Sequence, residues 1–219
     1  MGKIIAFGSH KGGVGKSTTK LSILIYLILS GYKCCSLECD DQHSIADALS
    51  TRQESGCTPD IDYYECYTDI PERACKLAEK YDFVLIDTPG KKSAEFRKAL
   101  ACADFLLTFI EPGAQIEINT LSQMVHDVKT AQAGLNSKMK AWIVLNKCPT
   151  DPRDTEASEL RKMLNDDPDW LPVPRQRIYY RKAHKQAYNS GQGVHEYNDK
   201  RGNKARGEIE LLLKEVGII

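Results

Sequence analysis

Residues 8–19 read GSHKGGVGKSTT, a glycine-rich stretch with two lysines that follows an apolar run and precedes a segment of helical character. Glycines let backbone N–H groups turn inward, where they can cradle phosphate oxygens, and a helix starting directly afterwards adds the positive end of its dipole. In such a pattern Lys16 is expected to reach the β- and γ-phosphates of a nucleotide, and the Ser17 hydroxyl to ligate Mg²⁺. The stretch therefore predicts a phosphate-binding loop between a strand and a helix.

The loop departs from the usual G-x-x-x-x-G-K-S/T pattern, because His10 occupies its first glycine position. A second lysine, Lys11, instead opens the run KGGVGKST. The run lies where a strand passes into a helix, so a chance glycine-rich turn is the weaker interpretation. The expected phosphate-binding residues are Gly12, Gly13, Val14, Gly15, Lys16, Ser17 and Thr18.

Short apolar runs alternate along the chain with stretches that can form helices. This alternation predicts an α/β fold with a mostly parallel, twisted sheet flanked by helices on both faces. Together with the phosphate-binding loop, it indicates a fold of the P-loop NTPase type. The length of 219 residues suits a single domain over residues 1–219. We expect an irregular region over 51–70 and helical segments near 180–190 and 203–216. The expected strands cover residues 3–9, 33–38, 81–87, 104–110 and 140–146.

Two acidic residues follow apolar strands at the edge where open α/β sheets bind ligands. The stretch YDFVLID ends in Asp87, which we expect to hold Mg²⁺, often through water. The stretch ECDDQHS, residues 38–44, carries Asp40. A carboxylate near Mg²⁺ and the γ-phosphate suits the positioning of an attacking water, although Asp40 as a simple helix cap is the alternative. Ser17, Asp40 and Asp87 are thus the expected metal-site residues.

Composition excludes several classes of protein. The 30 basic and 30 acidic residues cancel, which is unlike a highly charged disordered tail. Eight cysteines occur without a CxxC motif, so a zinc knuckle is disfavoured and free thiols are expected in a reducing, cytoplasmic compartment. The longest apolar stretch, 21–29, is far shorter than the about 20 residues of a membrane span. We therefore expect no membrane partner.

The run KGGVGKST resembles the deviant Walker A motif of the ParA/MinD superfamily of ATPases. This resemblance implies ATP/ADP and Mg²⁺ as cofactors and a homodimer that sandwiches ATP. It gives Lys11 the role of a signature lysine, which reaches the ATP of the partner subunit, and Asp40 the role of the second acid of the family's D-x-D-P-Q-G stretch. Glu38, Asp41 and His43 depart from that stretch.

A further strand end, IVLNK, places Asn146 where relatives often carry an adenine contact. Asn146 is therefore a candidate for binding the adenine, and a plain turn residue is the alternative.

Although the net charge of the whole sequence is zero, one segment is strongly basic. Residues 175–206 contain nine basic and two acidic residues, and Tyr179, Tyr180 and Tyr188 are interleaved with them. Basic stripes attract phosphate backbones without reading bases, although a solvated surface is the plainer interpretation. The segment resembles the C-terminal part of the small, ParF-like plasmid partition ATPases, which lack an N-terminal helix-turn-helix domain, as we expect here. The resemblance implies nonspecific DNA contacts by Arg177, Arg181, Lys182 and Lys185.

The leading hypothesis is a plasmid partition ATPase that dimerises with ATP, binds nucleoid DNA nonspecifically and hydrolyses ATP when a small, ParB-like DNA-binding partner stimulates it. A MinD-like membrane-cycling ATPase, or one that positions a protein cargo, is the alternative, although the polar positions of 208–215 are mostly acidic. Iron–sulfur reductases and amide-forming synthetases share the deviant loop, but no supporting cysteine motif accompanies it here.

Overall fold

The computed structural model describes residues 1–9, 11–89, 93–113, 118–199 and 202–219. Six parallel strands form one sheet in the order β3-β2-β4-β1-β5-β6. The five strands expected from the sequence are confirmed to within two residues at either end. The strands are β1 (Lys3–Ser9), β2 (Cys34–Glu38), β3 (Asp62–Glu65), β4 (Phe83–Asp87), β5 (Phe105–Ile110) and β6 (Lys140–Leu145).

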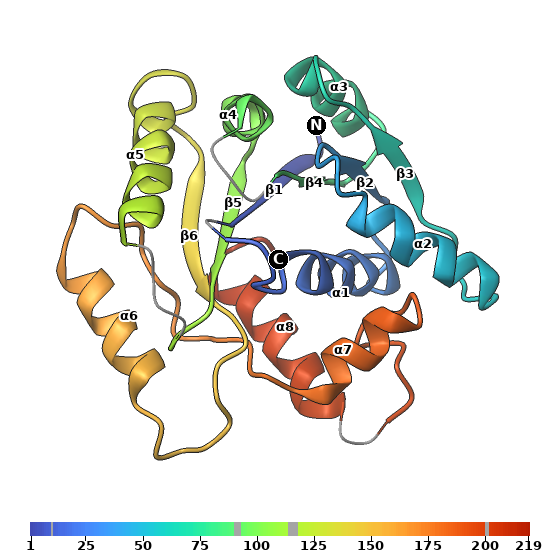
Figure 1. Cartoon of the computed structure of the whole chain (residues 1–219). Coiled ribbons are helices and arrows are strands. Elements are labelled where there is room, and N and C mark those ends of the chain that lie inside the picture. The colour runs from blue at the N-terminus through green and yellow to red at the C-terminus, as the bar shows by residue number, and fades with distance from the viewer. Residues whose placement is uncertain (10, 90–92, 114–117, 200–201) are drawn as a thin grey trace.

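Helices cover both faces of the sheet, as predicted (Figure 1). One face is packed by α1 (Lys16–Leu29), α7 (Lys182–Asn189) and α8 (Asn203–Glu215), with α2 (Ser44–Glu54) lying against α1. The other face is packed by α3 (Ile70–Ala78), α4 (Ala94–Cys102), α5 (Ile118–Gly134) and α6 (Glu156–Asp166). Among the helices that the structure describes, none combines the length and apolar character needed to cross a membrane.

The central strand β1 shows why these residues form a buried parallel sheet. Ile4 and Ala6 face the helix layer of α3–α6, whereas Ile5 and Phe7 face the layer of α1, α7 and α8. A strand that is apolar on both faces is stable only between two helix layers. This double burial leaves the carboxyl ends of the strands as the edge at which polar side chains can gather.

The expectation of an irregular region over 51–70 is wrong. α2 continues to Glu54, Asp62–Glu65 form the edge strand β3, and α3 starts at Ile70. β3 pairs with β2 alone, and its terminal acids are exposed while its two tyrosines are half-buried. A four-residue edge strand lacks the continuous apolar run that marks the inner strands.

The strand order reverses at β1, which pairs with β4 on one side and with β5 on the other. In open α/β sheets such a switch point creates a crevice at the carboxyl ends of the strands, where ligands bind. The described part of the loop, residues 11–15, lies after that end of β1 and passes directly into α1. The fold thus places the predicted phosphate loop at the crevice.

Candidate nucleotide site

The described part of the predicted phosphate loop has the open backbone that phosphate binding needs; His10 lies outside the described residues. Gly13 and Gly15 adopt left-handed φ angles of 81° and 83°, which side chains other than glycine rarely tolerate. A Cβ atom added at Gly12 or Gly13 would meet nothing within 4 Å. Gly15 is the residue immediately before α1, so the N-terminus of this helix faces the same space.

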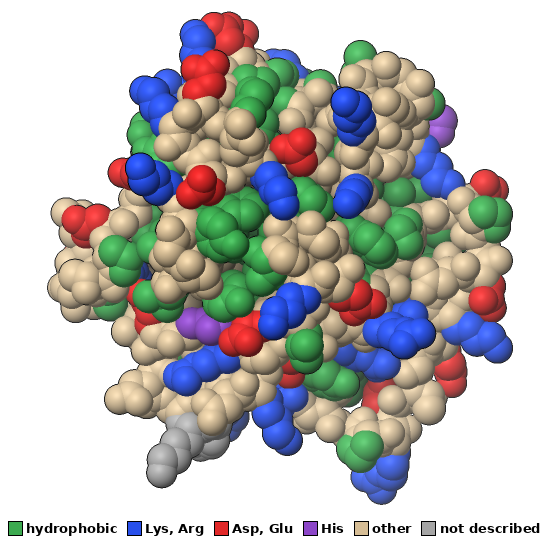
Figure 2. Space-filling model, turned by 180° about the vertical axis from the view of Figure 1, so that it is seen from behind, with side chains coloured by type: hydrophobic (Ala, Val, Ile, Leu, Met, Phe, Trp, Pro, Cys, Tyr) green, Lys and Arg blue, Asp and Glu red, His purple; other side chains and the backbone are tan. Residues whose placement is uncertain are grey.

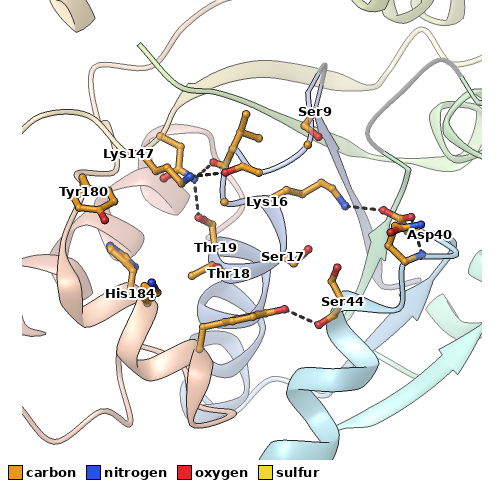
Figure 3. A pocket seen from close by; sticks show the side chains of 18 of the residues that line it. Ser9, Lys16, Ser17, Thr18, Thr19, Asp40, Ser44, Lys147, Tyr180 and His184 are labelled. Atoms are coloured by element: carbon orange, nitrogen blue, oxygen red, sulfur yellow. Dashed lines mark hydrogen bonds and ion pairs between the residues drawn. The ribbon is translucent and has the colours of Figure 1, made fainter. Parts of the chain in front are cut away.

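The side chains predicted to act on phosphate and Mg²⁺ converge beside this loop. Lys16, the first residue of α1, is 8% exposed and donates a hydrogen bond to Asp87 at the end of β4. Its ammonium lies 3.7 Å from Oδ2 of Asp40, towards which it extends in Figure 3. The Ser17 hydroxyl lies 3.4 Å from Oδ2 of Asp87. One helix start and two strand ends therefore assemble a site from residues far apart in sequence.

The oxygen donors at this point fit a magnesium nucleotide. Ser17, Asp40 and Asp87 supply a hydroxyl and two carboxylates, which are the hard ligands that Mg²⁺ prefers. Among the described residues no group of three or more His, Cys, Asp and Glu side chains could hold a metal by itself. A magnesium ion would therefore depend on phosphate oxygens to complete its coordination, as is usual for nucleotide sites.

Glu38, whose role the family pattern does not explain, supports the turn that carries Asp40. It is fully buried at the end of β2, where burial raises the pKa of its carboxyl group. Its carboxylate accepts hydrogen bonds from the backbone N–H groups of Asp40 at 3.4 Å and Ile45 at 3.3 Å. His43, at the family's glycine position, has a left-handed φ of 50°. The turn thus keeps a glycine-like conformation although its residues differ.

Lys20 belongs to the site but was not predicted. Its side chain is completely buried, with Nζ 3.8 Å from Oδ2 of Asp87, and burial lowers its pKa. Its position one helical turn after Lys16 is the sequence signal that could have indicated it, because residues four apart share a helix face.

Asn146 and Lys147, which follow β6, hold the phosphate loop through hydrogen bonds to its backbone. The Asn146 amide donates to the carbonyl of Val14 at 2.7 Å and lies 3.3 Å from the Thr19 hydroxyl. A Cβ at Gly15 would lie only 2.7 Å from Nδ2 of Asn146, so this position has room for glycine alone. Lys147 donates to the carbonyl of Gly13. The candidate for adenine binding therefore also has a structural task in the loop.

The site opens into a pocket of about 950 Å³. The phosphate loop and Asp40 form one part of its lining, and α7 with the residues before it forms another. Figure 3 shows Tyr180, His184 and Lys147 across the start of α1 from Asp40. This aromatic and basic wall was missed as part of the nucleotide site, because its residues were assigned to the basic segment alone. The wall comprises Tyr179, Tyr180, Arg181, His184, Lys185 and Tyr188.

The predicted DNA-contact residues divide into two groups. Lys182 and Lys185 are exposed on α7. Arg181 instead forms an ion pair of 2.6 Å with the buried Glu208 of α8, and Arg177 donates to the Ser158 hydroxyl at 3.1 Å. Two of the basic residues in 175–206, Lys200 and Arg201, lie outside the described residues.

On one face of the molecule, charge is distributed differently from its distribution along the sequence. On the face opposite to the view of Figure 1, basic side chains are interspersed with acidic and apolar ones rather than gathered in one block (Figure 2). Lys11 is exposed and is not part of the pocket lining. On this face, the segregation of charge along the chain thus does not produce a continuous block of basic side chains.

Comparisons with known proteins agree with this geometry. The chromosome-partitioning ATPase Soj of Thermus thermophilus is 23% identical over 168 residues, which cover 64% of this chain and 67% of that protein. Two solved structures share the fold: a putative plasmid partition protein of Borrelia burgdorferi bound to AMPPNP (18% identity, TM-score 0.68, covering 98% of this chain and 99% of that one) and an ATP complex of a McdA variant of Cyanothece (15%, 0.73, 99% and 96%).

Residues 3–187 match the family described as ATPase MipZ, a span that includes the phosphate loop, both acidic strand ends and most of α7. The resemblance noted from the run KGGVGKST is thereby confirmed. The chain belongs to the MipZ family of ATPases, within the ParA/MinD superfamily.

Proposed function

We propose that this protein is a nucleotide-switched partition ATPase that binds and hydrolyses MgATP. The observation that carries the proposal is the convergence of Lys16, Ser17, Asp40 and Asp87 on an open glycine loop at the start of α1. Family membership and the partition proteins among its relatives support the same assignment.

The residues divide the work of phosphoryl transfer among them. Backbone N–H groups of 12–15 and the α1 N-terminus hold the phosphates, and Lys16 leaves Asp87 to reach the β- and γ-phosphates. Ser17 and Asp87 would hold Mg²⁺, which would supply positive charge where negative charge develops on the phosphates. Asp40 orients the attacking water and accepts its proton. Asn146 keeps the loop in its binding conformation and lines the pocket, so it is also the candidate for contacting the base.

Dimerisation is the second part of the proposal. Lys11 is exposed beside the phosphate loop rather than turned into its own pocket. An exposed cation at this place can offset the negative charge of a triphosphate bound to a second subunit. ATP binding would then stabilise the dimer, and ATP hydrolysis would allow the two subunits to dissociate.

We propose that the dimer binds DNA without sequence preference. Lys182 and Lys185 are the exposed cations of α7, and Arg177 and Arg181 lie just before them. Because a dimer presents two such helices, DNA binding becomes dependent on ATP. A ParB-like partner bound to the cargo, which we propose is plasmid DNA, would stimulate ATP hydrolysis. Hydrolysis would then release the protein from the nucleoid DNA. Under this proposal the protein is cytoplasmic and associates with the nucleoid.

A MinD-like membrane cycle is less well supported by the C-terminal helix. Four apolar residues of α8 are fully buried in the core against the sheet, namely Ala205, Ile209, Leu212 and Leu213, whereas Leu211 is exposed. An interfacial membrane helix needs its apolar face available for lipid. This packing favours DNA over lipid as the partner surface.

The test is the affinity for a random-sequence DNA duplex, measured by fluorescence anisotropy without nucleotide, with ADP, and with a slowly hydrolysed ATP analogue. We expect tight, salt-sensitive binding with the ATP analogue alone, because counterion release requires several phosphate contacts at once. The double variant Lys182→Gln/Lys185→Gln should weaken binding, whereas Lys162→Gln on α6 is the control. Equal DNA affinity with and without nucleotide would contradict the switch.

A further inference from the structure

Lys20 is unusual because a buried ammonium group needs polar partners. Its side chain is fully buried within α1, and among the described residues Nζ has no hydrogen-bond partner. The nearest acidic oxygen is Oδ2 of Asp87 at 3.8 Å, a distance of attraction rather than of a formed hydrogen bond. The free-energy cost of burying this charge must be offset by favourable interactions with nearby groups.

Two buried carboxylates lie next to Lys20. Glu38 and Asp87 stand directly opposite each other in the parallel register of β2 and β4, and both are fully buried. Like charges in such a pair repel each other. Both carboxylates raise the pKa of Lys20, which opposes the larger lowering by burial. The lysine thus lies where it attracts two acids that would otherwise push apart.

Lys16 cannot permanently neutralise the charge of the Glu38 and Asp87 carboxylates. In the structure it donates to Asp87 and lies 3.7 Å from Asp40. Under the proposed function it turns to the phosphates, which leaves Glu38 and Asp87 without its charge. A second, fixed cation is then required to hold the two carboxylates in place.

We propose that Lys20 is a positioning residue of the nucleotide site, an internal cation that holds the Glu38–Asp87 pair together and releases Lys16 for the phosphates. The proposal rests on the proposed function, since it requires that Lys16 exchange a carboxylate for a phosphate. It also explains why this lysine stays buried without a close hydrogen bond: it balances two acids at once.

The first test replaces Lys20 by methionine, which keeps most of the side-chain volume. With Lys20→Met, Lys16 becomes the single lysine beside these carboxylates and is held there. We expect the affinity for a fluorescent ATP analogue in EDTA to fall about tenfold or more, the order expected when a buried charge pair loses one partner. With Mg²⁺ the loss should be much smaller, because the metal ion restores positive charge beside Asp87.

A second variant separates electrostatics from packing. In Lys20→Met/Glu38→Gln the unpaired carboxylate is neutralised as well, so both the affinity in EDTA and the thermal midpoint without nucleotide should recover towards wild type. Ser22→Ala, a buried uncharged change on the same helix, is the matched control and should leave the ratio of the two affinities unchanged.

The outcomes distinguish this proposal from the proposed function. Equal loss of affinity with and without Mg²⁺, no loss at all, or a double variant no more stable than Lys20→Met would overturn the role of Lys20. If Lys20→Met does not fold, the folding of the double variant decides. If the wild type binds no ATP analogue, the proposed function fails. The thermal midpoints of Lys20→Met and of the double variant, compared without nucleotide, would then still test whether Lys20 neutralises the two carboxylates.

Discussion

Lys11 and Lys16 are two lysines of one loop with opposite surroundings, since Lys16 is buried on Asp87 and Lys11 is exposed. Lys16→Ala should weaken nucleotide binding about ten- to a hundredfold, because a charge-assisted hydrogen bond to phosphate contributes about 1.5–3 kcal/mol. Lys11→Ala should preserve binding but prevent dimerisation. Titration with a fluorescent ATP analogue and light scattering measure the two properties separately. An ATP-dependent dimer of Lys11→Ala would refute the signature-lysine role.

The eight cysteines all lie in the described part of the chain and none is in a disulfide. Burial raises the pKa of Cys35 and of Cys148 to about 12, so both remain protonated at neutral pH. We expect iodoacetamide at pH 8 to modify the half-buried Cys57, Cys66 and Cys75 first, as peptide mass spectrometry can show. Modification of Cys35 as fast as Cys57 in the native protein would be the contrary result.

Helix α2 is tied to the segment after α7 by a buried ion pair. Arg52 is 3% exposed and donates to both carboxylate oxygens of Glu196 at 2.7 Å and to the carbonyl of Gly191 at 3.1 Å. Tyr188 donates to the carbonyl of Ser44 at 2.6 Å, two residues after Gln42. The turn that carries Asp40 is therefore connected to the basic wall of the pocket through hydrogen bonds.

Arg52→Met should lower the free energy of unfolding by about 3–5 kcal/mol, because it leaves the Glu196 carboxylate without its cation in a largely buried place. Urea denaturation followed by circular dichroism measures the loss. Arg153→Met is the control, since its pair with Asp151 is exposed and should leave the urea midpoint unchanged. Similar midpoint shifts for the two variants would argue against the buried pair as a stabilising element.

The inner elements could be predicted because each has a clear local pattern. The strands ending at Ser9 and Asp87 are apolar on both faces, and the glycine loop marks the start of α1. The edge strand Asp62–Glu65 could not be predicted, since its acids and half-buried tyrosines look like a loop. Lys20 was missed because a lysine in a helix is usually exposed.

The basic segment shows a different limit of sequence reasoning. Arg181 counts as a cation along the chain, yet in the fold it is paired with Glu208, which is 27 residues away. The ring nitrogens of His184 have no hydrogen-bond partner among the described residues, and the side chain lines the nucleotide pocket. Whether a charge faces DNA, a nucleotide or another side chain depends on tertiary packing, which spacing alone does not encode.

Stability of the whole protein should depend on pH through His195, which joins the segment after α7 to α8 and α1. It packs on Tyr26, and its Nε2–H donates a hydrogen bond to Oε1 of Glu210 at 3.2 Å. Burial lowers the pKa of His195 below its ordinary value of 6.5, against the opposing effect of Glu210. The unfolded chain therefore binds a proton at a higher pH than the folded protein, and stability falls as the pH drops below about 6.5.

His195→Phe keeps a ring against Tyr26 and removes the titrating group, so it should flatten the fall in stability between pH 6.5 and the lower pKa of the folded state. Urea midpoints of wild type and variant across about pH 5 to 8 provide the comparison. His126→Phe on α5 serves as the reference histidine variant. Parallel pH profiles for wild type and His195→Phe would show that other groups control acid stability.

The position of β1 has a consequence for synthesis. This strand precedes both of its partners in the chain, since β4 starts at Phe83 and β5 at Phe105. At about 5–20 residues per second, a ribosome needs roughly 4–15 s to make the chain between β1 and β4. During that interval the apolar strand and the apolar side of α1 have no sheet to join. A chaperone that shields the nascent N-terminal third should therefore raise the yield of folded protein more than one that acts after release.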